Sequence, residues 1–208
     1  MRLSDDSARH LLADTWRRWA RRCAELTPGQ WSTPTRCRPW DVRALVAHAC
    51  PEKALFDQLN DAIVDAPPQV GDAVDMLRFF NQPGGPAHTM AEELARTATE
   101  AATTLTAEDA VARFVECADA TLALTMPGHT VIRHPVVGTA MLAAVAEVAV
   151  MEATTHLLDL ADAVGGVEPS AAALAATRDL LIALPEPITA IETLTGRRAP
   201  GTTFPVLH

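Results

Sequence analysis

The sequence has 208 residues, of which 49% are hydrophobic and 21% are charged, and its formal net charge is −9 at pH 7. This composition is typical of a globular protein large enough to bury a core without disulfides, and it excludes extensive disorder. The excess of acidic residues argues against nucleic acid as a partner, because binding to phosphates relies on lysine and arginine. The lack of tyrosine and the low aromatic content (4%) disfavour a sheet protein and favour helices.

Neither a membrane-spanning segment nor an export signal is recognisable in the sequence. No stretch approaches ~20 uninterrupted apolar residues, and the first residues lack the apolar core of a signal peptide. Four cysteines occur without a CxxC pair, at positions Cys23, Cys37, Cys50 and Cys117. They are expected to be reduced thiols, with Cys50 acting as a small buried residue, and we expect a cytoplasmic protein with no membrane partner.

Apolar residues at helical spacing predict a first helix over residues 4–26, which a Thr-Pro-Gly sequence ends. A proline-containing loop is expected over residues 30–39, and a second helix is predicted to start near Trp40. Pro51 lies within the apolar pattern of this second helix. Because proline lacks an amide hydrogen and clashes with the preceding turn, it is expected to kink the helix or to start a new one. The apolar spacing then resumes over residues 55–64.

The second half of the chain has the same helical spacing. A short helix is predicted over residues 72–80, the NQPGGP sequence at 81–86 is expected to be a turn, and residues 130–135 are expected to be extended. Longer helices are predicted over residues 89–105, 107–124, 138–164 and 169–184, with an irregular tail after Thr195. These elements predict an all-α fold, a four-helix bundle with short additional helices, in a single domain over residues 1–208.

The most informative segment lies on the strongly apolar helix predicted late in the chain. Glu152 and His156 are four residues apart, so both side chains lie on one helix face, where a carboxylate and an imidazole can bind the same ion. Asp159 follows three residues later and could be a further ligand or the acceptor that orients an imidazole. A Glu–His pair at this spacing could equally form only a hydrogen bond. A metal site therefore needs another ligand from a second helix.

His48 is the best candidate for this further ligand. It follows Leu45 by three residues and Ala44 by four on the predicted second helix, so its side chain points toward the apolar side. A single inward-facing histidine can also be a hydrogen-bonded core residue, and only its combination with Glu152 and His156 favours a ligand. Two imidazoles and one carboxylate would leave coordination positions open for a substrate.

The motif W-x-x-x-x-L-V-A-H, which ends at His48, and the later motif E-x-x-x-H-x-x-D-L, which starts at Glu152, together resemble the DinB-like superfamily. Within it, the chain is most similar to the maleylpyruvate isomerase N-terminal domain family, the mycothiol-dependent branch from actinobacteria. The WSTPTRC loop at residues 31–37 and the LTGR run at residues 194–197 also fit this family. The Arg-rich, Lys-poor composition suits an actinobacterial source.

This resemblance implies an up-down DinB-like four-helix bundle in which His48, Glu152 and His156 bind a divalent metal ion, usually zinc. It also implies mycothiol as a cosubstrate. Family members with isomerase activity carry a small further domain with a catalytic arginine, and the residues after Gly166 contain no obvious counterpart. The resemblance therefore supports the metal site more directly than it supports the isomerase reaction.

A thiol close to a zinc ion loses its proton near neutral pH, because the metal stabilises the thiolate. We therefore expect a metal-dependent enzyme that transfers a low-molecular-weight thiol to a small electrophilic metabolite, or isomerises that metabolite by adding and releasing the thiol. Arg43, Arg133 and His134 are candidates for holding anionic groups, or are surface charges. Two alternatives stay open: a metal-dependent Lewis-acid cyclase of a biosynthetic pathway, and a metal- or ligand-binding bundle without turnover, including a homodimer.

Overall fold

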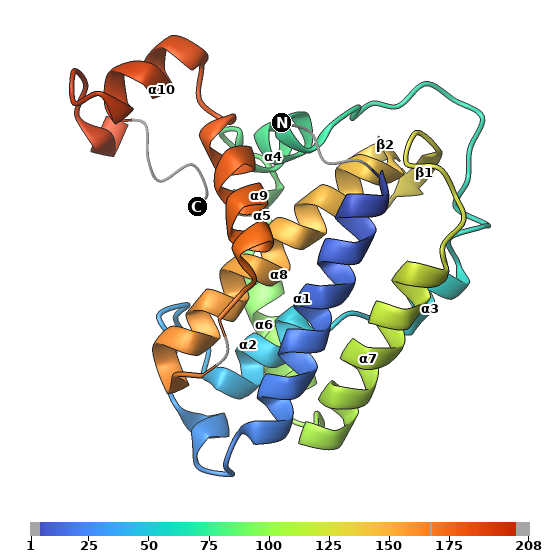
Figure 1. Cartoon of the computed structure of the whole chain (residues 1–208), viewed down its shortest axis with the longest axis vertical. Coiled ribbons are helices and arrows are strands. Elements are labelled where there is room, and N and C mark those ends of the chain that lie inside the picture. The colour runs from blue at the N-terminus through green and yellow to red at the C-terminus, as the bar shows by residue number, and fades with distance from the viewer. Residues whose placement is uncertain (1–4, 167, 203–208) are drawn as a thin grey trace.

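Helix α1 (Asp5–Glu25) lies alongside α7 (Ala107–Ala123) and α8 (Leu142–Val164), and these helices form the centre of the molecule (Figure 1). The computed structural model describes residues 5–166 and 168–202, so the predicted helix start at residue 4 lies outside the described residues. Helix α2 (Val42–Ala49) packs against α8 and against α6 (Ala91–Ala102). The predicted all-α bundle with short additional helices is confirmed.

The indole of Trp19 is completely buried where α1, α7 and α8 meet. Its Nε1 donates a hydrogen bond to the Ala153 carbonyl oxygen over 2.9 Å, and its ring stacks on Phe114 with centroids 5.4 Å apart. This hydrogen bond offsets the cost of burying the indole N–H, while the two rings fill the space between the helices. Apolar side chains from the four bundle helices complete the core, among them Leu12, Leu45, Val46, Ala118, Leu157 and Leu160.

Thr106 caps α7, and its loss is expected to destabilise the bundle moderately. Its Oγ1 accepts a hydrogen bond from the Asp109 amide over 3.0 Å, in a reciprocal capping box. Thr106→Ala should lower the free energy of unfolding by about 1 kcal/mol, because an amide at the helix start loses its partner. Urea unfolding followed by circular dichroism measures this change. Thr106→Ser should retain most of the stability, and Thr104→Ala, which alters an exposed threonine outside the cap, should change it by less than about 0.5 kcal/mol. Equal losses in Thr106→Ala and Thr104→Ala would contradict the capping role.

Three helices lie between residues 73 and 102. Helices α4 (Ala73–Asn81) and α6 correspond to the predictions over residues 72–80 and 89–105, and α4 packs against α8. Between them, α5 (Pro86–Thr89) is a single helical turn. The expected turn at residues 81–86 is therefore shorter than predicted, because Pro86 occupies the first position of α5, where a missing amide hydrogen costs nothing.

The continuous helical spacing predicted over residues 55–64 is wrong. Helix α2 ends at Ala49, and only α3 (Lys53–Asp57) follows before a series of turns. Cys50 ends α2 with extended backbone angles (φ −73°, ψ 118°), the conformation favoured for the residue directly before a proline, here Pro51. The apolar residues therefore do not all face the core, and Leu55 is 64% exposed.

A β-hairpin precedes α8, so the helix predicted over residues 138–164 starts later than expected. Strand β1 (Val131–His134) pairs with β2 (Gly138–Met141) in antiparallel register, with Ile132 opposite Ala140. Gly138 has φ +79°, a backbone conformation that suits glycine at the hairpin turn. The short apolar segment at 138–141 fits a strand as well as a helix, and pairing with β1 decides between them.

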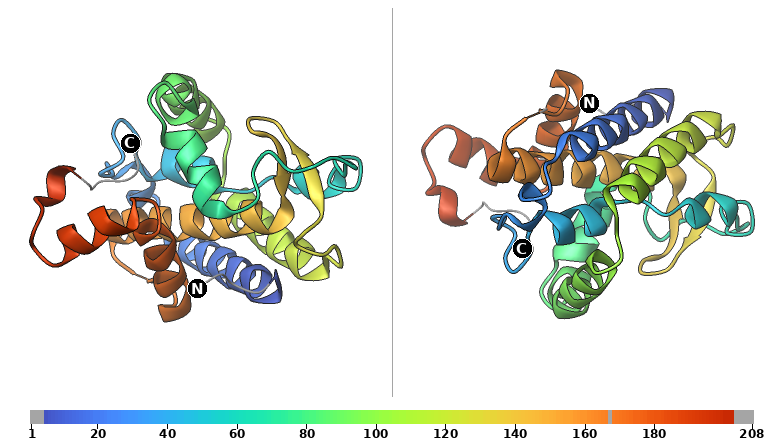
Figure 2. Two further views of the ribbon diagram at one scale, coloured as in Figure 1. Left: turned by 90° about the horizontal axis from the view of Figure 1, so that it is seen from above. Right: turned by 90° about the horizontal axis from the view of Figure 1, so that it is seen from below.

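The C-terminal part of the described chain lies on one side of the molecule, opposite the hairpin and α3 (Figure 2). It consists of α9 (Ala171–Ile182), which packs against α8, and α10 (Pro187–Leu194). The short 3-10 helices η1 (Gln30–Ser32) and η2 (Pro200–Thr202) complete the described elements. Among the residues that the structure describes, no helix is long and apolar enough to cross a membrane.

Candidate metal centre

Three potential metal ligands from two helices converge where α2 packs against α8. His48 lies in the last turn of α2, and Glu152 and His156 lie one turn apart on α8. Each residue has a ligand atom within 4.8 Å of those of the other two. The imidazole planes meet at 84° with centroids 4.9 Å apart, and His156 Nε2 lies 3.4 Å from Glu152 Oε2. The fold thus brings together the three residues that were predicted from the sequence to share one metal ion.

Asp159 orients the His156 ring through the second ring nitrogen. Its carboxylate accepts a hydrogen bond from His156 Nδ1 over 2.9 Å, and also accepts from Arg36 Nε over 2.6 Å and from Cys37 Sγ over 3.0 Å. Because Nδ1 donates its proton to Asp159, Nε2 is the nitrogen that faces Glu152. Of the two roles that the sequence allows for Asp159, the geometry matches the acceptor that holds an imidazole in place.

The electrostatics of the cluster separate the two histidines. Burial lowers the pKa of His48 to about 4, and the neighbouring His156 contributes to the same shift. Burial also acts to lower the pKa of His156, but hydrogen bonds with Asp159, Cys37 and Glu152 raise it to about 11. In the metal-free protein at neutral pH, the His48 ring is therefore neutral and can bind an ion directly. His156 carries a proton that an ion must displace.

The loop before α2 holds this end of the bundle in place. Thr35 Oγ1 donates to the Trp40 carbonyl oxygen over 2.8 Å, and Asp41 caps α2 by accepting from the Ala44 amide over 2.9 Å. These bonds seat the Trp40 indole beside the cluster, with its ring centroid 4.6 Å from that of His48. The indole limits the positions open to His48, because its ring occupies one side of the imidazole.

A second group of potential ligands shares His156 with the first. Cys37, His156 and Asp159 also place ligand atoms within 4.8 Å of one another. In this group, however, His156 Nδ1 and Cys37 Sγ already donate to the same Asp159 oxygen. Binding an ion there would break both hydrogen bonds at a nearly buried carboxylate, whereas His48 and Glu152 make no such bond to Asp159. The first group is therefore the better candidate for a cation.

The three residues suggested for binding anions lie apart from the cluster. The Arg43 guanidinium donates to the Leu105 carbonyl oxygen over 2.7 Å and lies 4.9 Å above the Trp31 ring, so it stabilises the loop before α7. Arg133 and His134 lie on strand β1, where both line a cavity beside the hairpin. The fold therefore gives Arg43 a structural contact and places only Arg133 and His134 where a ligand could reach them.

Arg36 and Cys37 also take part in the site, although no role for them was predicted from the sequence. Both belong to the WSTPTRC loop that was noted only as a family feature, and both donate to Asp159. The available signal was the combination of a positive charge in that loop and an acidic residue on an otherwise apolar helix, which needs a partner when it is buried. Their pairing could not be predicted, because it depends on how the loop folds back over α8.

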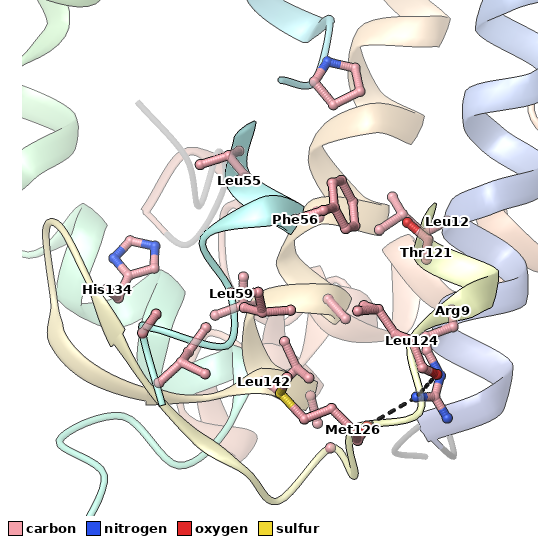
Figure 3. A pocket seen from close by; sticks show the side chains of 18 of the residues that line it. Arg9, Leu12, Leu55, Phe56, Leu59, Thr121, Leu124, Met126, His134 and Leu142 are labelled. Atoms are coloured by element: carbon pink, nitrogen blue, oxygen red, sulfur yellow. Dashed lines mark hydrogen bonds between the residues drawn. The ribbon is translucent and has the colours of Figure 1, made fainter. Parts of the chain in front are cut away.

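A cavity of about 820 Å³ extends along α8 from the hairpin toward the cluster. Its walls come from α1, α3, α7, α8 and β1, and Figure 3 shows Leu12, Phe56 and Leu142 among the side chains that surround it. Ala149 lines the cavity and lies three residues before Glu152, while Pro51 lines it three residues after His48. The cavity lining therefore comes within one helical turn of Glu152 on α8 and within three residues of His48 along the chain.

Two imidazoles and a carboxylate are donors that suit zinc and similar divalent ions, and the hydrogen bond from His156 to Asp159 orients one of the imidazoles. A helical bundle with such a cluster between two of its helices belongs to the class of candidate metal-binding bundle proteins. The chain belongs to the mycothiol maleylpyruvate isomerase N-terminal domain family, whose model matches residues 12–161 and so includes the whole cluster. No curated protein and no solved structure is significantly similar to it.

Proposed function

We propose that this protein is a divalent-metal-dependent enzyme that adds a low-molecular-weight thiol, mycothiol in the first instance, to an electrophilic metabolite. The observation that carries the proposal is the convergence of His48, Glu152 and His156 from two helices in a family named for a mycothiol-dependent reaction. A divalent ion bound by these residues would lower the pKa of a thiol at its open position and so favour the thiolate.

The chain's own residues would hold and orient this centre. His48 is neutral at physiological pH, so it can act as a ligand without first losing a proton. Asp159 fixes the His156 ring through Nδ1 and leaves Nε2 directed toward Glu152. The Trp40 ring beside His48 shields one side of the centre, which leaves the thiol and the electrophile to approach from the cavity side.

In the proposed reaction, the sulfur forms a bond to one carbon of an activated double bond, and the thiol proton ends on the adjacent carbon. If the adduct is released, the thiol is consumed and the reaction is a transfer. If rotation about the former double bond is followed by loss of a proton from the adjacent carbon and cleavage of the same carbon–sulfur bond, the double bond and the thiol are both regenerated and the reaction is an isomerisation. Thiol consumption therefore separates the two reactions.

The direct test is to incubate zinc-loaded protein with mycothiol and a panel of unsaturated acids and other electrophiles. Mass spectrometry should detect an adduct or an isomerised product with at least one of them, formed faster than without protein. A parallel series with glutathione tests thiol selectivity. If neither thiol reacts with any electrophile while zinc is bound, the enzymatic proposal fails and a binding bundle without turnover becomes the better description.

Zinc binding is expected to release about one proton per ion near neutral pH. His156 has a pKa raised to about 11 and must lose its proton to bind, whereas His48, with a pKa of about 4, is already neutral. The apparent affinity should therefore rise about tenfold per pH unit between pH 5 and 8 and fall as the pH decreases. Calorimetry in buffers of different ionisation enthalpy counts the protons. A pH-independent affinity above pH 6 would contradict this assignment of the His156 proton.

A further inference from the structure

The large cavity next to the candidate centre has a markedly apolar lining. Side chains of Leu12, Trp16, Leu55, Phe56, Leu59, Leu124, Met126, Ile132, Leu142 and Val145 contribute to its walls. Its volume of about 820 Å³ falls within the range of ~300–1,000 Å³ found for pockets that bind drug-sized ligands. A small, highly charged acid would leave most of this apolar surface in contact with water, so the lining favours a ligand with a large apolar body.

The cavity and the candidate ligands occupy neighbouring parts of one helix face. Val145 and Ala149 line the cavity, and Glu152 and His156 continue the same spacing of three or four residues along α8. At 1.5 Å per residue, the axis from Leu142 to His156 is about 21 Å long. A ligand that lies along this face can therefore have its reactive end near the centre and its other end at the hairpin.

The polar groups of the cavity are few, and their contacts differ. Arg9 donates from Nη1 to the Leu124 and Met126 carbonyl oxygens over 2.9 and 3.0 Å, which ties α1 to the loop after α7 (Figure 3). Arg133 on β1 makes no side-chain hydrogen bond or ion pair within the part of the chain that the structure describes. Asp61 is the acidic residue of the lining, so the cavity has an excess of positive charge.

His134, the next residue on β1, adds a hydrogen-bond donor. Its Nδ1 accepts from the backbone amides of Val136 and Val137 over 3.2 and 3.3 Å, so in the neutral ring the proton is on Nε2. Figure 3 shows this ring on the hairpin side of the cavity, away from Arg9. Successive side chains of a strand point to opposite faces, so Arg133 and His134 lie on different sides of β1. The Arg133 guanidinium is the cationic group at this end of the chamber and suits a carboxylate head group.

We propose that the cavity binds an electrophile with a long apolar chain, with its carboxylate at Arg133 and, at the other end of the chain, a double bond that is conjugated to a carbonyl group and directed toward His48 and His156. This inference rests on the proposed function and deepens it, because it names the substrate class for the same site. Addition of the thiol would form a carbon–sulfur bond at one alkene carbon and place the thiol proton on the other, so no further reactant is needed.

Binding is tested with dansyl-aminoundecanoic acid, a fluorescent carboxylic acid with an apolar chain, and with dodecanoate as a competitor. We expect saturable binding at one site per chain in both metal-free and zinc-loaded protein, and displacement by dodecanoate. Ala146→Phe fills the cavity from α8 and should weaken binding at least tenfold, whereas Ala112→Phe on the exposed side of α7 should not. Absence of saturable binding, or equal effects of the two variants, would overturn the proposal.

A second pair of variants tests the same site with substitutions at exposed residues, where loss of folding is not expected. Leu55 is 64% exposed and lines the cavity, and Leu194 is 62% exposed on α10 and does not. Leu55→Ser should weaken binding several-fold with an unchanged circular dichroism spectrum, whereas Leu194→Ser should leave it unaltered. Binding that both variants retain in full would place the probe elsewhere and overturn the proposal.

The position of the carboxylate is tested separately. Arg133→Gln should weaken dodecanoate about tenfold and leave dodecanol, the neutral counterpart, nearly unchanged, because only the charged head group loses a partner. An equal effect on both compounds would exclude Arg133 as the carboxylate site. Zinc content and thiol addition to a small electrophile are measured in parallel. If these persist while the long-chain probe fails to bind, the proposed function survives and only this inference fails.

Discussion

His156→Ala is expected to abolish stoichiometric zinc binding, from about one ion per chain to none above background. The substitution removes the ligand that lies between Glu152 and Asp159, and two remaining donors cannot complete a stable site. The protein is purified without chelator, incubated with zinc and desalted, and its metal content is determined by mass spectrometry. His156 belongs to both described groups of potential ligands, so its loss leaves neither group complete.

His129→Ala is the matched control for this experiment. His129 is exposed and belongs to neither group of potential ligands, so its loss should leave the zinc content unchanged. His48→Ala and Glu152→Gln should each lower zinc content as His156→Ala does. Zinc retained in all three variants would show that the ion binds elsewhere. No zinc in the wild type would mean that these residues are structural and would favour a bundle without a metal.

Asp159→Asn is expected to weaken zinc binding by 10- to 100-fold without abolishing it, the usual cost of losing an outer hydrogen-bond partner of a ligand. Burial alone would raise the pKa of Asp159, yet hydrogen bonds from His156, Cys37 and Arg36 hold it at about 2. Asparagine keeps the shape but lacks the charge that sets the His156 ring and its proton on Nδ1. Competition with a chromogenic chelator measures the affinity.

Asp162→Asn on the exposed side of α8 is the matched control, and it should change zinc affinity less than twofold. Asp162→Asn removes the same charge as Asp159→Asn, but this charge acts on the ion only through long-range electrostatics, which solvent screens. Equal losses in both variants would mean that Asp159 acts only as a nearby negative charge. A change in circular dichroism confined to Asp159→Asn would instead identify a structural role for its contacts with Arg36 and Cys37.

The helices of the bundle could be predicted closely from the sequence, because helical periodicity is a local property. The prediction over residues 107–124 matches α7 (Ala107–Ala123), where Thr106 supplies the cap, and the prediction over residues 169–184 matches α9 after the cap Ser170. Where the pattern was short, it was ambiguous. Residues 138–141 are as apolar as a helix start, and only pairing with Val131–His134 makes them a strand.

In the candidate site, too, some features follow from local sequence and others depend on tertiary packing. The sequence determined that Glu152 and His156 share a helix face, because a spacing of four residues fixes their geometry once α8 forms. Only the tertiary structure decided that His48 meets them, that Arg36 and Cys37 donate to Asp159, and that Arg43 turns away to the Leu105 carbonyl. These contacts join segments far apart in the chain, so they depend on how α2 and its preceding loop pack against α8, and no local pattern encodes that packing.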